Sequence, residues 1–258
     1  MDKDKAASLL LSNWEATTRI DALPPDCRPA DRAQGYAVAA RLAELTGADV
    51  AGWKIAATSE AGQRHINVDG PLAGRILRHR LKPEGAAVPL GDNIMRVAEA
   101  EFAFSFGIDL PPRPLPYTVD EAMAAVTSLH LSIEVPDSRY SDFTRVGAPS
   151  LIADTACASW LVLSGAVTAP WRHLDLSQQR VTGWRNGTQV AEGSGKAVLG
   201  DPRLALTWFV NEAAAHCGGV RAGQFVTTGT CIVPLAIAPG DSIRMDYGEL
   251  GSISATIT

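Results

Sequence analysis

The chain has 258 residues, 46% hydrophobic and 20% charged, so it can bury a substantial core as one large domain or two unequal ones. Its net charge is −5 at pH 7 and it has no run of Lys or Arg, which argues against nucleic acid as a partner. No apolar run approaches the length of a membrane span, and the charged start at residues 1–5 lacks a secretory pattern, which argues against a membrane partner. The four widely separated cysteines form no C-x-x-C pair, as expected for reduced thiols in a cytoplasmic protein.

The N-terminal region combines helical and strand patterns. Helical spacing of apolar residues predicts helices over residues 3–21 and 30–46. Residues 50–56 are typical of a strand, and Lys54 stands among apolar neighbours in it. Two interpretations of Lys54 remain open: a buried ammonium paired with carboxylates, or a lysine whose head group reaches solvent.

Two apolar stretches in the middle of the chain carry three glutamates. Residues 97–106 and 129–135 both alternate in the way that strands do. The alternation places Glu99 and Glu101 on one face and the phenylalanines on the other. Glu134 occupies the matching face of the second strand.

These glutamates have two interpretations. Charged residues commonly alternate with core residues on the solvent face of an antiparallel strand. Alternatively, carboxylates two residues apart on an apolar strand repel each other unless a cation lies between them, and a third carboxylate nearby would complete a set of oxygen ligands for a hard divalent ion. The sequence pattern alone leaves both open.

The remaining elements favour an α+β fold. We expect a capped helix over 119–127, a hairpin over 181–192, a helix from 202 to 216 and short strands within 225–233, 242–247 and 252–257. The strands are mostly clustered and do not alternate with helices. This order predicts a mixed, curved sheet or barrel, not a doubly wound sheet.

Several common chemistries lack their signatures. There is no G-x-S-x-G nucleophile motif and no G-x-G-x-x-G motif after a strand. Gly193–Lys196 lacks the frame of a phosphate-binding loop, so Lys196 is either an exposed loop lysine or a residue that contacts substrate. The five histidines show no metal-ligand spacing.

Six segments, in order along nearly the whole chain, are similar to one known family. They are residues 52–59 (GWKIAATS), 68–71 (VDGP), 98–104 (AEAEFAF), 133–139 (IEVPDSR), 195–208 (GKAVLGDP…W) and 239–252 (PGD…YGELGS). Together they resemble the 2-keto-4-pentenoate hydratase family of the fumarylacetoacetate hydrolase superfamily.

The resemblance implies a mixed β-roll fold with a smaller helical part at residues 1–75, a catalytic domain at 76–258 and a homo-oligomeric enzyme. It implies that Mg²⁺ or Mn²⁺ is held by three carboxylates and that a lysine takes part in catalysis. The residues that match these roles are Glu99, Glu101 and Glu134 for the metal, Lys54 and Asp69 for catalysis, and Gly229, Thr230 and Lys196 for substrate binding.

Departures from the family pattern bear on the reaction. Leu72 stands where the family has an acid/base aspartate, which makes Asp69 a candidate replacement. We therefore expect a hydratase that acts on a small 2-oxo or 2-hydroxy-dienoic acid, with an aldolase or decarboxylase of the same pathway as a partner. The alternatives are a decarboxylase of a 2-oxo-3-enedioate, a hydrolase of an acylpyruvate, or a non-catalytic relative that retains the metal. A second cation for a diacid would come from Lys196, Arg64 or Arg75.

Overall fold

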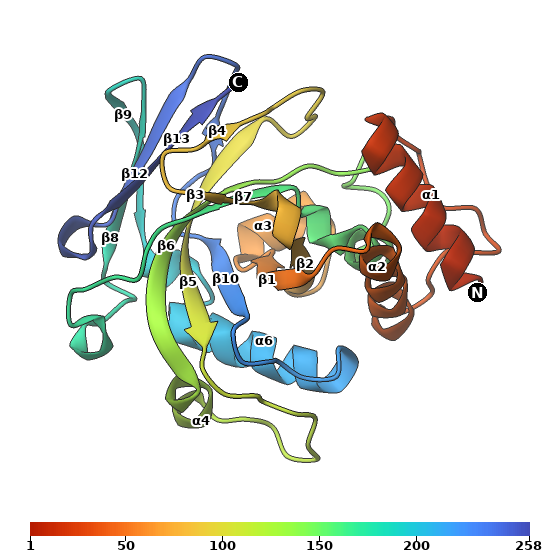
Figure 1. The fold of residues 1–258 in the computed structure, drawn as a ribbon, viewed down its shortest axis with the longest axis horizontal. Coiled ribbons are helices and arrows are strands. Elements are labelled where there is room, and N and C mark those ends of the chain that lie inside the picture. The colour runs from red at the N-terminus through yellow and green to blue at the C-terminus, as the bar shows by residue number, and fades with distance from the viewer.

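The computed structural model describes residues 1–258 and places a helical part beside two β-sheets (Figure 1). The helices are α1 (Lys3–Ala16), α2 (Arg32–Thr46), α3 (Glu60–His65), α4 (Val119–Ala124), α5 (Ala148–Ala153) and α6 (Pro202–His216). The strands are β1 (Val50–Ala56), β2 (Leu72–Leu77), β3 (Leu81–Pro83), β4 (Ala87–Val88), β5 (Val97–Phe106), β6 (Val126–Val135), β7 (Trp160–Leu163), β8 (Arg180–Arg185), β9 (Thr188–Ser194), β10 (Phe225–Thr230), β11 (Leu235–Ala236), β12 (Ser242–Asp246) and β13 (Ser252–Ile257).

The larger sheet has eight strands in the order β2-β1-β10-β5-β6-β7-β3, with β11 paired to β5. It is mixed, because β1 runs parallel to β10 and β3 runs parallel to β7, whereas the other pairs are antiparallel. The smaller sheet has the order β4-β13-β12-β8-β9. The long strands β5 and β6 curve across the molecule (Figure 1). The predicted α+β class with a mixed, curled sheet is confirmed.

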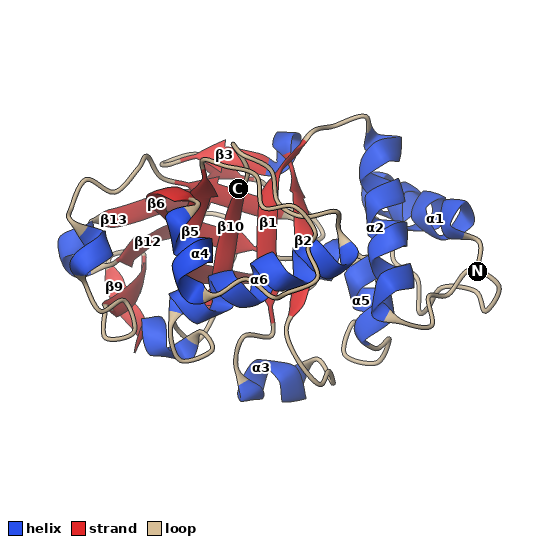
Figure 2. Ribbon diagram, turned by 90° about the horizontal axis from the view of Figure 1, so that it is seen from below, coloured by secondary structure: helices blue, strands red, loops and turns tan.

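The helices cover the larger sheet from different sides. Figure 2 shows α6 lying along the sheet, with α1, α2 and α5 gathered at one end of the molecule. The buried face of α6, including Leu206 and Phe209, joins the main core of 48 buried residues. A separate core of nine buried residues lies mainly between α1 and α2. The helical part therefore has a small core of its own.

The helices α1 and α4 end earlier than expected, for identifiable reasons. α1 ends at Ala16 because Thr17 adopts a left-handed conformation with φ 54°, and the chain then leaves the helix axis. α4 ends at Ala124 because β6 already begins at Val126. The predicted strands at residues 50–56 and 97–106 have the expected bounds.

The expected division of the chain at residues 75/76 falls inside β2. Both β1 and β2 are strands of the larger sheet, with the short helix α3 between them, whereas α1 and α2 precede β1. Lys54 therefore lies on the sheet that also carries the glutamates.

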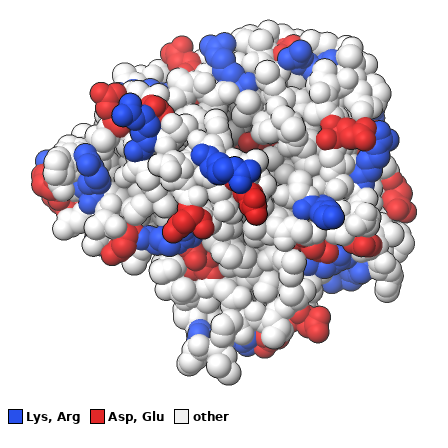
Figure 3. All heavy atoms as spheres, turned by 180° about the vertical axis from the view of Figure 1, so that it is seen from behind, with Lys and Arg blue, Asp and Glu red and all other residues white.

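The surface shows no dominant charge of one sign on the face seen in Figure 3, where acidic and basic side chains are interspersed. None of the helices combines the length and the apolar character needed to cross a bilayer.

Candidate functional site

Three glutamates meet at the middle of the larger sheet. In the antiparallel pair β5 and β6, Glu99 lies opposite Glu134 and Glu101 lies opposite Ser132. Opposite residues in such a pair point to the same face. One carboxylate oxygen from each of the three glutamates lies within 4.8 Å of the others. The solvent-face interpretation is excluded for Glu101 and Glu134, because both side chains are 0% exposed.

The buried carboxylates lack the partners that such groups need. Glu101 Oε2 accepts a 3.1 Å hydrogen bond from the Gly229 N–H, but Glu101 Oε1 and both Glu134 oxygens have no hydrogen-bond donor. Burial and then the neighbouring Glu134 raise the pKa of Glu99 to about 7. Burial also raises the pKa of Glu101 and of Glu134. Buried carboxylate oxygens that accept no hydrogen bond and lie this close together fit a hard divalent cation.

Lys54 faces this cluster from the middle of β1. It is 3% exposed, and its Nζ lies 3.1 Å from Glu134 Oε1, an ion-pair distance without hydrogen-bond geometry. Burial by itself would lower the pKa of Lys54, but Glu134, Glu99 and Glu101 together raise it above its ordinary value. Of the two interpretations of this lysine, the buried and paired one is correct.

A strained turn fixes the position of the lysine head group. Lys54 Nζ donates a 3.0 Å hydrogen bond to the carbonyl of Ala156, which lies in a run of three non-glycine residues with positive φ, residues 155–157. Arg139, which is 1% exposed, forms a buried ion pair with Asp154 and donates a 2.8 Å hydrogen bond to the Ala158 carbonyl. These contacts bracket the turn and hold it against its conformational cost.

A cavity of about 520 Å³ opens beside the cluster. Glu99, Lys54, Thr58 and Thr230 are among its polar lining residues. Most of the remaining lining is apolar and includes Ile55, Leu72, Met95, Phe143, Leu151, Ile232 and Val233. The cavity therefore combines a mostly apolar wall with a few charged and polar groups, as small-molecule sites commonly do.

The structure brings most, but not all, of the expected site residues together. Gly229 and Thr230 line the cavity, in agreement with their expected place at the site. Asp69 and Lys196 are exposed and are not among the lining residues. Leu72 lines the cavity and is 0% exposed, so the position where the family has an aspartate is an apolar part of the wall.

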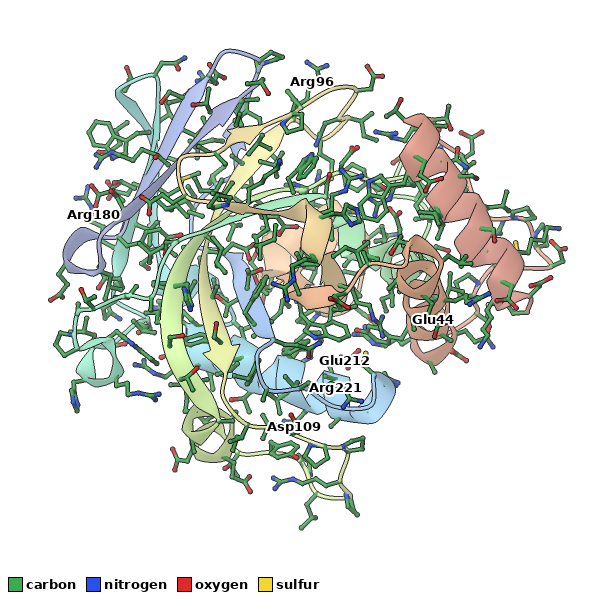
Figure 4. All side chains as sticks on the ribbon, in the orientation of Figure 1. Glu44, Arg96, Asp109, Arg180, Glu212 and Arg221 are labelled. Atoms are coloured by element: carbon green, nitrogen blue, oxygen red, sulfur yellow. The ribbon has the colours of Figure 1, made fainter.

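Sequence reasoning missed other polar residues of the cavity. His65, at the end of α3, lines it and packs edge-on against Phe143 with ring centroids 6.0 Å apart. Glu192 lines it too, but its carboxylate pairs with Arg180, which Figure 4 labels. The available signal for His65 was its place in the short helix that directly follows the strand of Lys54.

Comparison with known proteins agrees with this geometry. The family model described as fumarylacetoacetate (FAA) hydrolase C-terminal matches residues 80–258. The chain belongs to this family.

Its relatives are enzymes of the hydratase and decarboxylase branch. A 4-oxalocrotonate decarboxylase of Pseudomonas putida is 32% identical over 216 residues, covering 83% of this chain and 80% of the relative. A 2-keto-4-pentenoate hydratase of Burkholderia vietnamiensis is 29% identical over 263 residues, covering 100% and 99%. The structure of a 4-oxalocrotonate decarboxylase from Pseudomonas putida G7, complexed with magnesium and adipate, matches with a TM-score of 0.88 at 27% identity, covering 100% and 99%. The chain is thus an enzyme of this branch.

Proposed function

We propose that this enzyme adds water to a 2-hydroxy-2,4-dienoate with an uncharged tail and yields a 4-hydroxy-2-oxo acid. The observation that carries the proposal is the lining of the cavity beside the carboxylate cluster. Lys54 and Glu99 of the cluster line it, and most of the other lining residues are apolar. A substrate with a single acid group and a short hydrocarbon tail matches this lining.

Glu99, Glu101 and Glu134 are the proposed ligands of Mg²⁺ or Mn²⁺. The oxygens of Glu101 and Glu134 that accept no hydrogen bond support this assignment, and a relative has been crystallised with magnesium. When bound, such an ion acts as a Lewis acid toward the carboxylate and the C2 oxygen of a 2-oxo acid.

The residues of the chain would handle binding and protons. Gly229 and Thr230 are proposed to bind the oxo-acid end. Lys54 carries a positive charge at neutral pH, because its neighbouring carboxylates hold its pKa high, and can stabilise the enolate oxygen or deliver a proton. Protonation of the dienol at C5 gives an α,β-unsaturated ketone, to which water adds at C4 with a proton at C3. His65 lines the cavity and Asp69 does not, so His65 is the better candidate for the second proton transfer.

The absence of a second cation favours hydration over decarboxylation of a diacid. Lys54 is the one lysine or arginine among the lining residues. Arg64 has a side chain that is 72% exposed and pairs with Glu60, and Lys196 is exposed outside the lining. Arg75 lines a different cavity. A second substrate carboxylate in this mostly apolar cavity would therefore be desolvated without a lysine or arginine partner of its own.

The decisive test compares two substrates under the same metal concentration. We expect a higher kcat/KM for 2-hydroxypenta-2,4-dienoate than for 4-oxalocrotonate, with the hydrated product identified by mass. Arg64→Gln should leave the ratio unchanged. Faster release of CO₂ from 4-oxalocrotonate would contradict the proposal and select the second candidate, a decarboxylase, which the 32% identity to such enzymes favours.

Other outcomes would select the remaining alternatives. Cleavage of an acylpyruvate would indicate a hydrolase, and metal binding without turnover of any 2-oxo acid would indicate a non-catalytic relative. A homo-oligomeric state and a partner enzyme of the same pathway stay predictions. Light scattering measures the oligomeric state.

A further inference from the structure

A second cavity lies on the opposite face of β1 and β2 from the carboxylate cluster. Trp53 and Arg75 are cross-strand partners and share one face, whereas Lys54 and Gly74 share the other. The second cavity has a volume of about 510 Å³, and Trp53 and Arg75 line it. It has no lining residue in common with the first cavity, and no residue of the proposed reaction lies in it.

Three arginines line this second cavity. Arg75 comes from β2, Arg78 from the turn that follows β2, and Arg221 from the loop between α6 and β10, where Figure 4 labels it. Asp49 is the one carboxylate in the lining, so three guanidinium groups and one carboxylate leave two net positive charges. This local excess has the opposite sign to the net charge of −5 of the whole chain.

Arg75 is buried without an anion. It is 7% exposed, and its guanidinium makes no ion pair and no hydrogen bond to an oxygen, although it stacks 4.6 Å from the Trp53 ring. The Cys217 thiol beside it stays neutral, because burial raises the pKa of that thiol to about 11. The other deeply buried arginine, Arg139, has its counterion in Asp154. A buried guanidinium without such a counterion is costly.

Three acidic residues near the cavity, besides the lining residue Asp49, are engaged elsewhere. Glu44 of α2 pairs with Arg41, and Glu212 of α6 pairs with Arg32. The Asp109 carboxylate accepts a 2.7 Å hydrogen bond from a backbone N–H of the loop at residues 221–224. Figure 4 labels all three acidic residues around this region. None of them serves as the counterion of Arg75.

We propose that this cavity binds the dianionic phosphoryl group of a small phosphorylated compound. Guanidinium groups match phosphate oxygens with paired hydrogen bonds, and two net positive charges balance a dianion. The volume of about 510 Å³ lies in the range of small-molecule pockets and exceeds what a phosphoryl group alone needs. The remaining space, beside the Trp53 ring, accommodates the rest of the ligand.

Calorimetry on the full-length, Mg²⁺-loaded protein tests this site with two probes, inorganic phosphate and glycerol 3-phosphate, at constant ionic strength set by chloride. Both probes should bind the wild-type protein, glycerol 3-phosphate more tightly. Loss of one charge-assisted contact in Arg221→Gln should weaken binding at least about tenfold. Arg75→Gln should weaken it further. Arg145→Gln is the control. Arg145 is exposed, lies outside this cavity and makes no side-chain hydrogen bond, so its replacement should leave the affinity for both probes unchanged.

Three results would overturn the proposal. One is the absence of phosphate binding to the wild-type protein, and another is an equal loss of binding in the Arg145 variant. The third is a lower molar mass of Arg221→Gln in solution, which would make the cavity a contact between copies of the chain. If Arg75→Gln does not fold, Arg221→Gln decides the question, because its exposed side chain supports no core packing.

Discussion

Glu101 connects the carboxylate cluster to β10, because one of its oxygens accepts the Gly229 N–H and the other has no partner. Glu101→Gln keeps the shape and one acceptor oxygen but removes the charge that a cation needs. We expect Mg²⁺ affinity to fall by at least about 100-fold, since even partners of metal ligands contribute up to that factor, and turnover to fall with it. Calorimetry and steady-state rates measure the two effects.

The matched control for this change is Glu192→Gln. Glu192 lines the same cavity but pairs with Arg180 outside the cluster. Glu192→Gln should leave Mg²⁺ affinity unchanged. If Glu101→Gln and Glu192→Gln changed Mg²⁺ affinity equally, Glu101 would not be a metal ligand.

Lys54 should matter for the reaction and not for metal binding. Lys54→Met fills the same space without a charge, and we expect kcat to fall by about 10²- to 10⁴-fold, the range of general acid–base catalysis. Mg²⁺ affinity should be retained, because removal of a competing cation does not weaken the site. Lys196→Met is the control and should leave kcat and KM near their wild-type values. A large rise in KM in the Lys196→Met variant would show that Lys196 contacts the substrate.

The carboxylate cluster also predicts how stability depends on pH. In the metal-free protein the pKa of Glu99 is about 7, above its ordinary value of 4.5. The folded state then holds a proton that the unfolded state releases, so the free energy of unfolding falls as the pH rises from about 4.5 to about 7. Because Mg²⁺ needs deprotonated carboxylates, its stabilising effect should grow over the same window. Tm measured with and without Mg²⁺ near pH 5 and near pH 8 checks this, and a larger Mg²⁺ effect at the lower pH would contradict it.

At the scale of elements, the end of β10 packs closely against Thr58, which lies in the segment directly after β1. Gly229 has φ 97°, and a Cβ at this position would lie 2.1 Å from Thr58 Oγ1. Gly229→Ala should lower the free energy of unfolding by at least the ~1–3 kcal/mol of backbone strain and should displace the N–H that contacts Glu101. Gly200→Ala is the control, since Gly200 has a similar φ of 88° but open space around its Cβ position. Urea denaturation measures the free energy of unfolding of both variants, and the difference between them is the cost of the clash with Thr58. Equal losses of stability would mean that Thr58 moves aside without an energetic cost.

Strand alternation made part of the site predictable. Two-residue periodicity was enough to place Glu99 and Glu101 on one face of a strand, and the register of β5 and β6 confirms that Glu134 shares it. The register itself was not predictable, because it depends on the β6 start at Val126 and on the connection at residues 107–125, which contains α4. The strained turn at residues 155–157 was also unpredictable, since left-handed non-glycine residues leave no sequence signal.

At the scale of the whole molecule, composition and motif order predicted the class of fold but not the shapes of its cavities. The cavity beside the carboxylate cluster draws its lining from elements that are distant in the sequence, including β1, α3, β2, β5, β9 and β10. This assembly turns Leu72 into an apolar wall and leaves Asp69 and Lys196 outside. The second, arginine-lined cavity depends on the opposite face of the same two strands, and no sequence motif marks that face as a site.

The most direct measurement of the central claim follows the ultraviolet absorbance of freshly generated 2-hydroxypenta-2,4-dienoate. The wild-type protein is assayed with Mg²⁺, then with excess EDTA, then with Mg²⁺ restored, and the product is identified by mass. The proposed site predicts decay to 4-hydroxy-2-oxopentanoate that stops with EDTA and returns with Mg²⁺, and no decay with Glu101→Gln. Decay at an unchanged rate in EDTA, or no decay with Mg²⁺ bound, would contradict it.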